Sequence, residues 1–283
     1  MASSTLASAE ARLAHFAREW SVRVDQTAST ESSLIAFGTS GGQPVVLKVA
    51  RAQDDEWRAG DILAAFHGGG AARVLECGEG VVLLERAVPG ESLVDLSKAG
   101  RDDEATAVLA DIIAKMSLGA TVVEAPSAQD WSRSFATYLT SGDTRLPREH
   151  VVEAADQFAR LAASQTKTRL LHGDLHHYNV VRDERRGWLA IDPKGVIAEV
   201  EYEIGAVLRN PAGLPNVVLD PGVIERRVAH FAAHLALEPE RILAWGFAQA
   251  VLSAIWNMED GFDADPSDIG LRLALVLRPM ISV

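Results

Sequence analysis

Polar residues of the types used in phosphoryl transfer gather in one short stretch of the chain. The segment 170–181 reads LLHGDLHHYNVV, and it places Asp174 five residues before Asn179 between two apolar runs. A second carboxylate, Asp192, ends the next apolar run. Phosphoryl transfer from a nucleotide uses one Asp to orient the attacking hydroxyl, and an Asn and an Asp to hold Mg²⁺ against the phosphates. The spacing therefore predicts Asp174 as the catalytic group and Asn179 and Asp192 as the Mg²⁺ ligands.

Two other interpretations of this stretch stay open. A single Asp, Asn or His in a loop is usually a turn residue or a cap. His172, His176 and His177 are also spaced closely enough to serve as zinc ligands, although no Cys lies near them. Neither interpretation accounts for the ordered series of polar residues and the later Asp-Pro pair, so we favour phosphoryl transfer over both.

A lysine stands inside an apolar strand nearer the N-terminus. Lys48 lies in the run VVLKV, where the period-2 alternation of a strand turns it away from its apolar neighbours. Taken alone, this pattern is typical of an edge-strand lysine that faces solvent. Glu56 follows eight residues later, on a predicted helix face that is otherwise small or apolar. Because an unpaired charge in an apolar strand is costly, we expect Lys48 to pair with Glu56, or with the adjacent Asp54 or Asp55.

The elements predicted around these residues divide the chain near residues 85–90. The first part predicts, in order, a helix with Leu6, Leu13, Phe16 and Trp20, strands 34–37 and 45–49 joined by a loose Gly-rich turn, a helix ending at His67, and strands 74–75 and 81–84. The second part predicts helices over 102–118, 131–139, 148–163 and from about 221 onward. Pattern alone thus predicts an α+β protein with domains 1–88 and 89–283.

Composition narrows the classes of partner. The chain has 283 residues, 48% of them hydrophobic, which is enough for a sizeable core. Its net charge of −12 argues against nucleic acid and anionic lipid as partners. No apolar run approaches the roughly 18 residues of a membrane span, and the N-terminus lacks the pattern of a secretory signal. The single cysteine, Cys77, fits a reducing compartment, so we expect a cytoplasmic protein without membrane partners.

Three stretches together resemble the aminoglycoside phosphotransferase superfamily, which has a protein-kinase-like fold. They are HGDLHHYN at 172–179, GWLAIDPKG at 187–195 and LRNP at 208–211. The doubled His and the Trp-x-x-x-Asp-Pro-Lys-Gly run narrow the resemblance to its streptomycin 6-kinase and hydroxyurea phosphotransferase branch. The resemblance covers residues 29–211 and implies an α+β two-lobe fold, with a small antiparallel-sheet N-terminal lobe and a larger, mostly helical C-terminal lobe.

The same resemblance implies an activity. It implies an enzyme that moves the γ-phosphate of ATP, with Mg²⁺, to a hydroxyl of a small molecule such as an aminoglycoside or a hydroxyurea-type antibiotic. A metabolic kinase for an amino alcohol or a sugar is one alternative. A nucleotide-binding pseudokinase that acts as a regulator is a less favoured one, because every polar position needed for activity is present.

The resemblance also implies how the nucleotide is held. Lys48 contacts the α- and β-phosphates, and Glu56 holds Lys48 in place. Backbone groups of Glu85 and Ala87 pair with the adenine. A glycine-rich phosphate loop is missing, since the chain reads TASTESS before the second strand. Hydroxyls and backbone amides around Ser32 would therefore cover the phosphates instead.

Carboxylates in the helical part are candidates for binding a cationic acceptor. One group follows the predicted metal ligand and the other lies near Trp256; they are Glu199, Glu201 and Glu203, and Glu259, Asp260, Asp263, Asp265 and Asp268. Because charge runs are usually solvated, an exposed acidic loop is the competing interpretation of the second group. Glu203 is alternatively a brace for the lobe, and Lys194 is a candidate for balancing phosphate charge.

Overall fold

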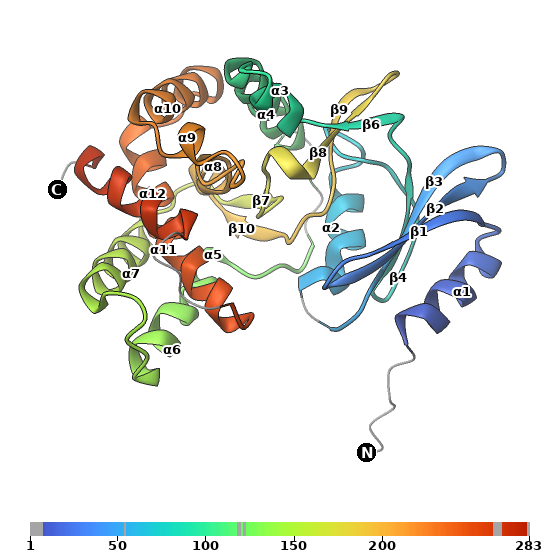
Figure 1. Ribbon diagram of the computed structural model, residues 1–283, viewed down its shortest axis with the longest axis horizontal. Coiled ribbons are helices and arrows are strands. Elements are labelled where there is room, and N and C mark those ends of the chain that lie inside the picture. The colour runs from blue at the N-terminus through green and yellow to red at the C-terminus, as the bar shows by residue number, and fades with distance from the viewer. Residues whose placement is uncertain (1–7, 54, 118–119, 121–122, 263–267, 282–283) are drawn as a thin grey trace.

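The N-terminal part of the chain is a five-stranded sheet, and most of the remainder is helical (Figure 1). This architecture comes from a computed structural model that describes residues 8–53, 55–117, 120, 123–262 and 268–281. No helix in those ranges is both long and apolar enough to cross a membrane. The division of the chain at residue 88 stays a prediction, because the core formed by α2 (Ala59–Ala65) is continuous with that of the helical part.

The N-terminal sheet is antiparallel throughout, in the order β1-β2-β3-β5-β4. Its strands are β1 (Arg23–Ser29), β2 (Ser33–Ser40), β3 (Gln43–Ala50), β4 (Val74–Gly78) and β5 (Val81–Glu85). Alternate side chains of β3 point to opposite faces. Val45, Leu47 and Val49 are fully buried in a core that includes residues of α1 (Ala9–Glu19). Lys48 consequently lies on the other face of the sheet, which is turned toward the helical part of the chain.

The turn between β2 and β3 is tighter than its sequence predicts. Both strands continue up to a two-residue turn at Gly41 and Gly42, whose φ angles are 57° and 78°. Positive φ at both central positions is the requirement of a type I′ turn, which matches the twist of the strands. Gly38 is not part of the turn but lies within β2, where an added Cβ would come within 2.2 Å of a backbone oxygen of β1.

The predicted helix ending at His67 is shorter and begins differently from expectation. Glu56 lies in a 3₁₀ turn, η1 (Asp55–Arg58), and the α-helix α2 follows it. Asp54, the alternative start, lies outside the described residues. The buried side chains Ile62 and Leu63 fix the orientation of α2 against the core. Glu56 therefore reaches Lys48 from a turn rather than from a helix face.

Helices make up most of the C-terminal part. They are α3 (Val94–Lys98), α4 (Asp102–Met116), α5 (Ala128–Trp131), α6 (Arg133–Ser141), α7 (Arg148–Ala163), α8 (Val200–Leu208), α9 (Pro215–Val218), α10 (Pro221–Leu235), α11 (Pro239–Glu259) and α12 (Ile269–Leu277). The predicted helix 148–163 is confirmed as α7, whereas the predicted helix 131–139 is split between α5 and α6. The long helix α11 packs on α7, α8 and α12, and its Trp245 is fully buried.

Short strands carry the motif residues to the boundary between sheet and helices. They are β6 (Pro89–Ser92), β7 (Arg169–Leu171), β8 (Val180–Asp183), β9 (Gly187–Ala190) and β10 (Val196–Ala198), with the 3₁₀ turn η2 (His177–Asn179) before β8. β7 pairs with β10, and β8 pairs with β6 and β9. Ala190 of β9 also forms a bridge to Ala71, just after α2. The loop after β7 and the segment after β9 are thereby held side by side (Figure 1).

Candidate active site

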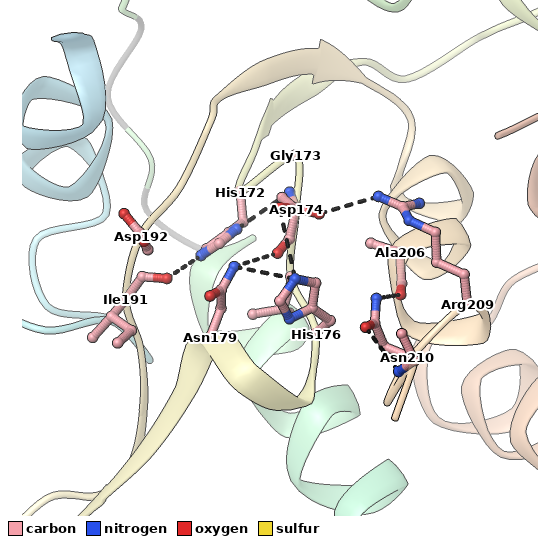
Figure 2. Close-up of polar contacts among 12 residues, drawn as sticks. His172, Gly173, Asp174, His176, Asn179, Ile191, Asp192, Ala206, Arg209 and Asn210 are labelled. Atoms are coloured by element: carbon pink, nitrogen blue, oxygen red, sulfur yellow. Dashed lines mark hydrogen bonds and ion pairs between the residues drawn. The ribbon is translucent and has the colours of Figure 1, made fainter. Parts of the chain in front are cut away.

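The carboxylate of Asp174 is the centre of the polar site (Figure 2). Its side chain is 20% exposed, with Oδ1 3.1 Å from Nη2 of Arg209 and Oδ2 3.7 Å from Nε2 of His176. Burial alone would raise the pKa of Asp174, but its interactions with His176, including a hydrogen bond, and then with the charge of Arg209 hold it well below its usual range. Asp174 is therefore ionised at neutral pH.

The loop that carries Asp174 is fixed by hydrogen bonds to its backbone. Asn179 Nδ2 donates to the carbonyl oxygen of Asp174 at 2.9 Å. His172 Nε2 lies 2.9 Å from the carbonyl oxygen of Ile191, and its Nδ1 is 3.3 Å from the amide of Asp174. Burial lowers the pKa of His172 to about 4, so the ring is neutral. One ring nitrogen thus bonds the segment after β9 and the other bonds the loop itself, which makes His172 a structural residue rather than a zinc ligand.

Nothing else in the described ranges supports the zinc interpretation. His, Cys, Asp and Glu side chains there form no group of three or more placed to hold a metal. His177 is buried, and its Nε2 lies 3.5 Å from Nη2 of Arg227, a cation that would compete with any metal. The doubled His of the motif therefore contributes to packing and to the surroundings of Asp174.

Glu203 of α8 holds the same loop in place through hydrogen bonds to its backbone. Its carboxylate accepts hydrogen bonds from the amides of His172 at 2.7 Å, Gly173 at 3.0 Å and Leu175 at 3.3 Å. Gly173 has φ of 82°, and an added Cβ would lie 3.1 Å from the ring of Trp131. The loop can turn this tightly because glycine adopts positive φ at little cost. Glu203 is therefore the brace that the sequence offered as its alternative role, not an acceptor contact.

The buried carboxyl group of Glu203 leads to a prediction about how the stability of the protein depends on pH. Burial raises the pKa of Glu203 from 4.5 to about 7, against the lowering effect of the three amides. The folded state then holds this proton more tightly than the unfolded chain does, so stability is lost as pH rises through the folded pKa. Between the unfolded pKa of 4.5 and the folded pKa of about 7, the free energy of unfolding of the native protein should fall, relative to that of Glu203→Gln, by at most about 1.4 kcal/mol per pH unit. Urea unfolding of both proteins at pH 5, 6, 7 and 8 measures it; parallel profiles would contradict the assignment.

Lys48 joins the sheet to the segment after β9. Its ammonium group forms ion pairs with Glu56 and with Asp192, as the sequence predicts for the first of these. Burial lowers the pKa of Lys48, but the two carboxylates outweigh it, and the net shift is upward. Ser33 Oγ lies 3.5 Å from the Glu56 carboxylate and adds a further contact. The cation is thus fixed at the boundary between the two parts of the chain.

A cavity of about 310 Å³ opens beside Lys48 and Asp192. Its walls are mostly apolar, and one side is residues 85–90, which run from the end of β5 into β6 and are called the connecting segment below. The lining residues are Ile35, Phe37, Val46, Lys48, Ala72, Leu84, Glu85, Arg86, Ala87, Pro89, Gly90, Val181, Ile191 and Asp192. The cavity therefore combines a mostly apolar interior with a few charged groups, the general form of a small-molecule or cofactor site.

The structure places two of the three other predicted nucleotide residues at this cavity. Glu85 and Ala87 line it, whereas Ser32 does not. Ser32 lies in the turn between β1 and β2, and its carbonyl oxygen accepts a hydrogen bond from the Arg51 amide at 2.8 Å. In the described part of the chain, the N–H and C=O of Ala87 make no hydrogen bond. These two groups are free to pair with a ligand.

A second cavity, of about 290 Å³, lies on the helical side. Its lining combines acidic, aromatic and basic side chains: Asp130, Trp131, Ser134, Lys194, Trp256, Glu259 and Asp260. Ser134 Oγ lies 3.1 Å from the Glu259 carboxylate and accepts the Trp256 indole N–H at 3.2 Å. The Lys194 ammonium lies 5.6 Å from the ring centre of Trp256. Two of the predicted acceptor carboxylates, Glu259 and Asp260, thus line a cavity at the end of α11, where both side chains are also exposed to solvent.

The remaining carboxylates that the sequence singled out lie elsewhere. Glu199 is buried, where it pairs with Arg241 and accepts the indole N–H of Trp245. Asp268 caps α12 by accepting the Leu271 amide at 3.0 Å. Glu201 is likewise absent from the lining of the second cavity, and Asp263 and Asp265 lie outside the described residues. Asp268 therefore stabilises a helix end and Glu199 has its partners within the core, so neither is needed to explain a ligand site.

Arg209 is the site residue that sequence reasoning missed. It ends α8, is 9% exposed, and donates to Asp174 and, at 3.3 Å, to the side-chain oxygen of Gln249. Its signals in the sequence are a charge at the end of the apolar run IGAVL and its place in the stretch LRNP, neither of which gives it a role. Such a charge is costly in a core unless it is paired, and the partner lies 35 residues away in the chain.

The fold is that of the protein-kinase-like phosphotransferases. Aminoglycoside phosphotransferase APH(4)-Ia, in a ternary complex with ADP and hygromycin B, superposes with a TM-score of 0.69 at 15% identity, over 96% of this chain and 99% of that one. Choline kinase LicA from Streptococcus pneumoniae gives a TM-score of 0.64 at 12% identity, over 95% and 97%. The predicted fold class, a small antiparallel sheet followed by a mostly helical part, is confirmed.

The family follows from sequence comparison. Residues 19–261 match the aminoglycoside/hydroxyurea antibiotic resistance kinases, and the chain belongs to that family. Streptomycin 3''-kinase of Klebsiella pneumoniae is 36% identical over 249 residues, 85% of this chain and 90% of that protein. Hydroxyurea phosphotransferase of Kitasatospora aureofaciens is 30% identical over 274 residues, 90% of this chain and 75% of that protein. The predicted enzyme class, a small-molecule kinase, is confirmed.

Proposed function

We propose that this protein transfers the γ-phosphate of ATP to a hydroxyl of a small cationic acceptor of the streptomycin type. One observation carries the proposal: the three-residue segment Asp192–Lys194 connects the two cavities. Asp192 lines the cavity beside Lys48, and Lys194 lines the cavity of acids and tryptophans. The charge of Lys194 also acts on Asp174. The three sites that a phosphotransferase requires, for nucleotide, reacting hydroxyl and acceptor, are thereby adjacent.

Asp174 orients the acceptor in this mechanism. Arg209 holds one carboxylate oxygen, and the other, which lies 3.7 Å from His176 Nε2, accepts a hydrogen bond from the acceptor hydroxyl. With a pKa well below its usual range, Asp174 is a weak base, so it takes the proton only as the new oxygen–phosphorus bond forms. Catalysis then rests mainly on positioning and charge, as in other phosphoryl transfers.

Lys48, Asn179 and Asp192 bind the phosphate end of the nucleotide. Lys48 provides a fixed positive charge at the end of the cavity. Asn179 uses its amide nitrogen on the carbonyl oxygen of Asp174, and its side-chain oxygen lies on the other side of the amide group (Figure 2). An amide oxygen and a carboxylate are hard ligands that suit Mg²⁺, which usually takes one or two protein oxygens together with phosphates and water. Mg²⁺ bound by these residues would neutralise part of the negative charge on the phosphates.

The second cavity is proposed to bind the acceptor. Carboxylates of Asp130, Glu259 and Asp260 offer charge-assisted hydrogen bonds to ammonium or guanidinium groups. Trp131 and Trp256 pack edge to face, with ring centres 5.4 Å apart, and supply flat apolar surface beside those acids. A polycationic sugar presents both kinds of group, since its rings have apolar faces and its substituents carry charge.

A panel of acceptors tests the proposed function. The purified protein is mixed with labelled ATP, Mg²⁺ and, one at a time, streptomycin, hygromycin B, hydroxyurea, choline and an uncharged sugar. Transfer of label to streptomycin, with little to the uncharged sugar, is the expected result. Transfer to choline alone would point to a metabolic amino-alcohol kinase. Tight ATP binding with no transfer to any compound would point to a pseudokinase, and both outcomes would overturn the proposal.

The acidic cavity makes a prediction about acceptor affinity. Glu259→Gln with Asp260→Asn should raise the acceptor KM about tenfold, equivalent to roughly 1.4 kcal/mol, while sparing the KM for ATP. The effect should shrink as salt is added, because screening at 0.15 M acts over about 8 Å. The matched control is Glu149→Gln with Asp156→Asn, which removes the same charge from the exposed face of α7. Equal acceptor KM for both double variants at low salt would refute the assignment.

A further inference from the structure

The tip of the β8–β9 hairpin, residues 183–186, lies against the connecting segment. Asp183 Oδ2 accepts the Val88 amide at 3.1 Å, and the Glu184 amide donates to the Val88 carbonyl at 2.9 Å. Asp183 Oδ1 also accepts the amides of Arg185 and Arg186, both at 2.9 Å. The tip therefore has a fixed shape, and it binds the connecting segment through both the N–H and the C=O of Val88.

Arg186 extends this grip to two further segments. Its guanidinium forms an ion pair with Glu85, at the end of β5. Its Nη2 donates to the carbonyl oxygens of Gly68 at 2.6 Å and Ala71 at 3.2 Å, both just after α2. Glu85 Oε1 in turn accepts the Arg73 amide at 2.8 Å. One side chain thus joins the hairpin tip, the end of β5 and the segment after α2.

The connecting segment is a wall between two cavities. Glu85 and Arg86 line both the nucleotide cavity and a cavity of about 690 Å³ behind it. Arg186 lines only the rear cavity. Ala87, whose backbone groups are free, lies between the two points at which the tip holds the segment, Glu85 and Val88. The rear cavity provides space into which the connecting segment could shift if its contacts with the hairpin tip were lost.

We propose that Arg186 is a positioning residue for the nucleotide, a role that rests on the proposed function. It does not touch the ligand. It holds Glu85, and with it the connecting segment, so that the Ala87 backbone faces the adenine at a fixed depth. Loss of this contact should weaken nucleotide binding without slowing phosphoryl transfer from nucleotide that is bound, since Lys48, Asp174 and Asp192 belong to other segments.

Arg186→Met tests the inference against Arg185→Met, a change of the same kind at an exposed neighbour on the tip. Arg186→Met should raise the KM for ATP and the Kd for ADP by about tenfold, with kcat and the acceptor KM unchanged. Arg185→Met should alter none of these. Arg186→Lys keeps the charge but not the planar fork of donors, so we expect a partial rescue.

The outcomes separate this inference from the proposed function. An unchanged Kd for ADP in Arg186→Met, or a loss of kcat and acceptor binding together, would overturn it. Where Arg186→Met fails to fold, Glu85→Gln removes the same ion pair and should raise the Kd for ADP in the same direction. ADP binding is measured by calorimetry without acceptor, so it reports on Arg186 even if the acceptor panel gives no transfer. Absence of ADP binding by the native protein would instead refute the nucleotide site itself.

Discussion

Asp174→Asn is expected to lower kcat by a factor of about 10²–10⁴, the usual cost of losing a general base. The amide is nearly isosteric, so the loop should keep its bonds to Asn179 and Glu203. It cannot accept the proton, and its NH₂ group would compete for the acceptor hydroxyl. The nucleotide cavity is untouched, so calorimetry should show the native affinity for ADP while steady-state assays show the loss of turnover.

The control for this variant is Asp156→Asn, the same chemical change on the exposed face of α7. It should leave kcat unaltered. Asp174→Asn also deprives the buried Arg209 of its charged partner, leaving Gln249 as a neighbour, so some stability should be lost. Turnover is therefore compared well below the melting temperature. A variant that keeps most of its activity on the true acceptor would exclude Asp174 as the catalytic group.

Asp192→Ala should remove most of the Mg²⁺-dependent component of ATP binding. Altering even an outer-shell partner of a bound metal typically costs about 10- to 100-fold in affinity, and a direct ligand should cost at least that. Lys48 keeps Glu56 as its partner in this variant, so binding of ATP without metal should change much less. Calorimetric titration of ATP with and without Mg²⁺ measures both.

Glu56→Gln provides the contrast. It removes a carboxylate from the same lysine but not a proposed metal ligand, so ATP should bind more weakly with the dependence on Mg²⁺ retained. If Asp192→Ala and Glu56→Gln lose the same affinity, and Mg²⁺ still strengthens binding in both, Asp192 is not the ligand. The two carboxylates on Lys48 would then have one shared role, that of fixing the cation.

Sequence reasoning brought the correct residues together where local spacing determines how they lie. Asp174 and Asn179 lie on one loop between two strands, so five residues of spacing determine their relation. The ion pair of Lys48 and Glu56 was predicted because a charge within an apolar strand needs a partner close by in the chain. The helix 148–163 was found because it has a strong apolar stripe and a clear length.

It failed where two distant segments meet. Arg209 and Asp174 are 35 residues apart, and Arg186 and Gly68 are 118 apart, so no local pattern connects either pair. The tight turn at Gly41 and Gly42 was predicted as a loose one because Gly38 was assigned to it. That glycine is required instead by the close approach of β1. Too many acidic residues were considered as acceptor contacts, because the sequence does not distinguish a carboxylate that caps a helix, such as Asp268, from one that binds a ligand.

The free backbone of Ala87 has a consequence for the design of inhibitors of this kinase. Drug escape usually works by exchanging a side chain that the drug contacts, and the acids of the second cavity are open to such exchange. A main-chain N–H and C=O are present whatever residue is encoded, except that proline removes the N–H. An inhibitor anchored on residue 87 would leave the enzyme few single substitutions by which to evade it.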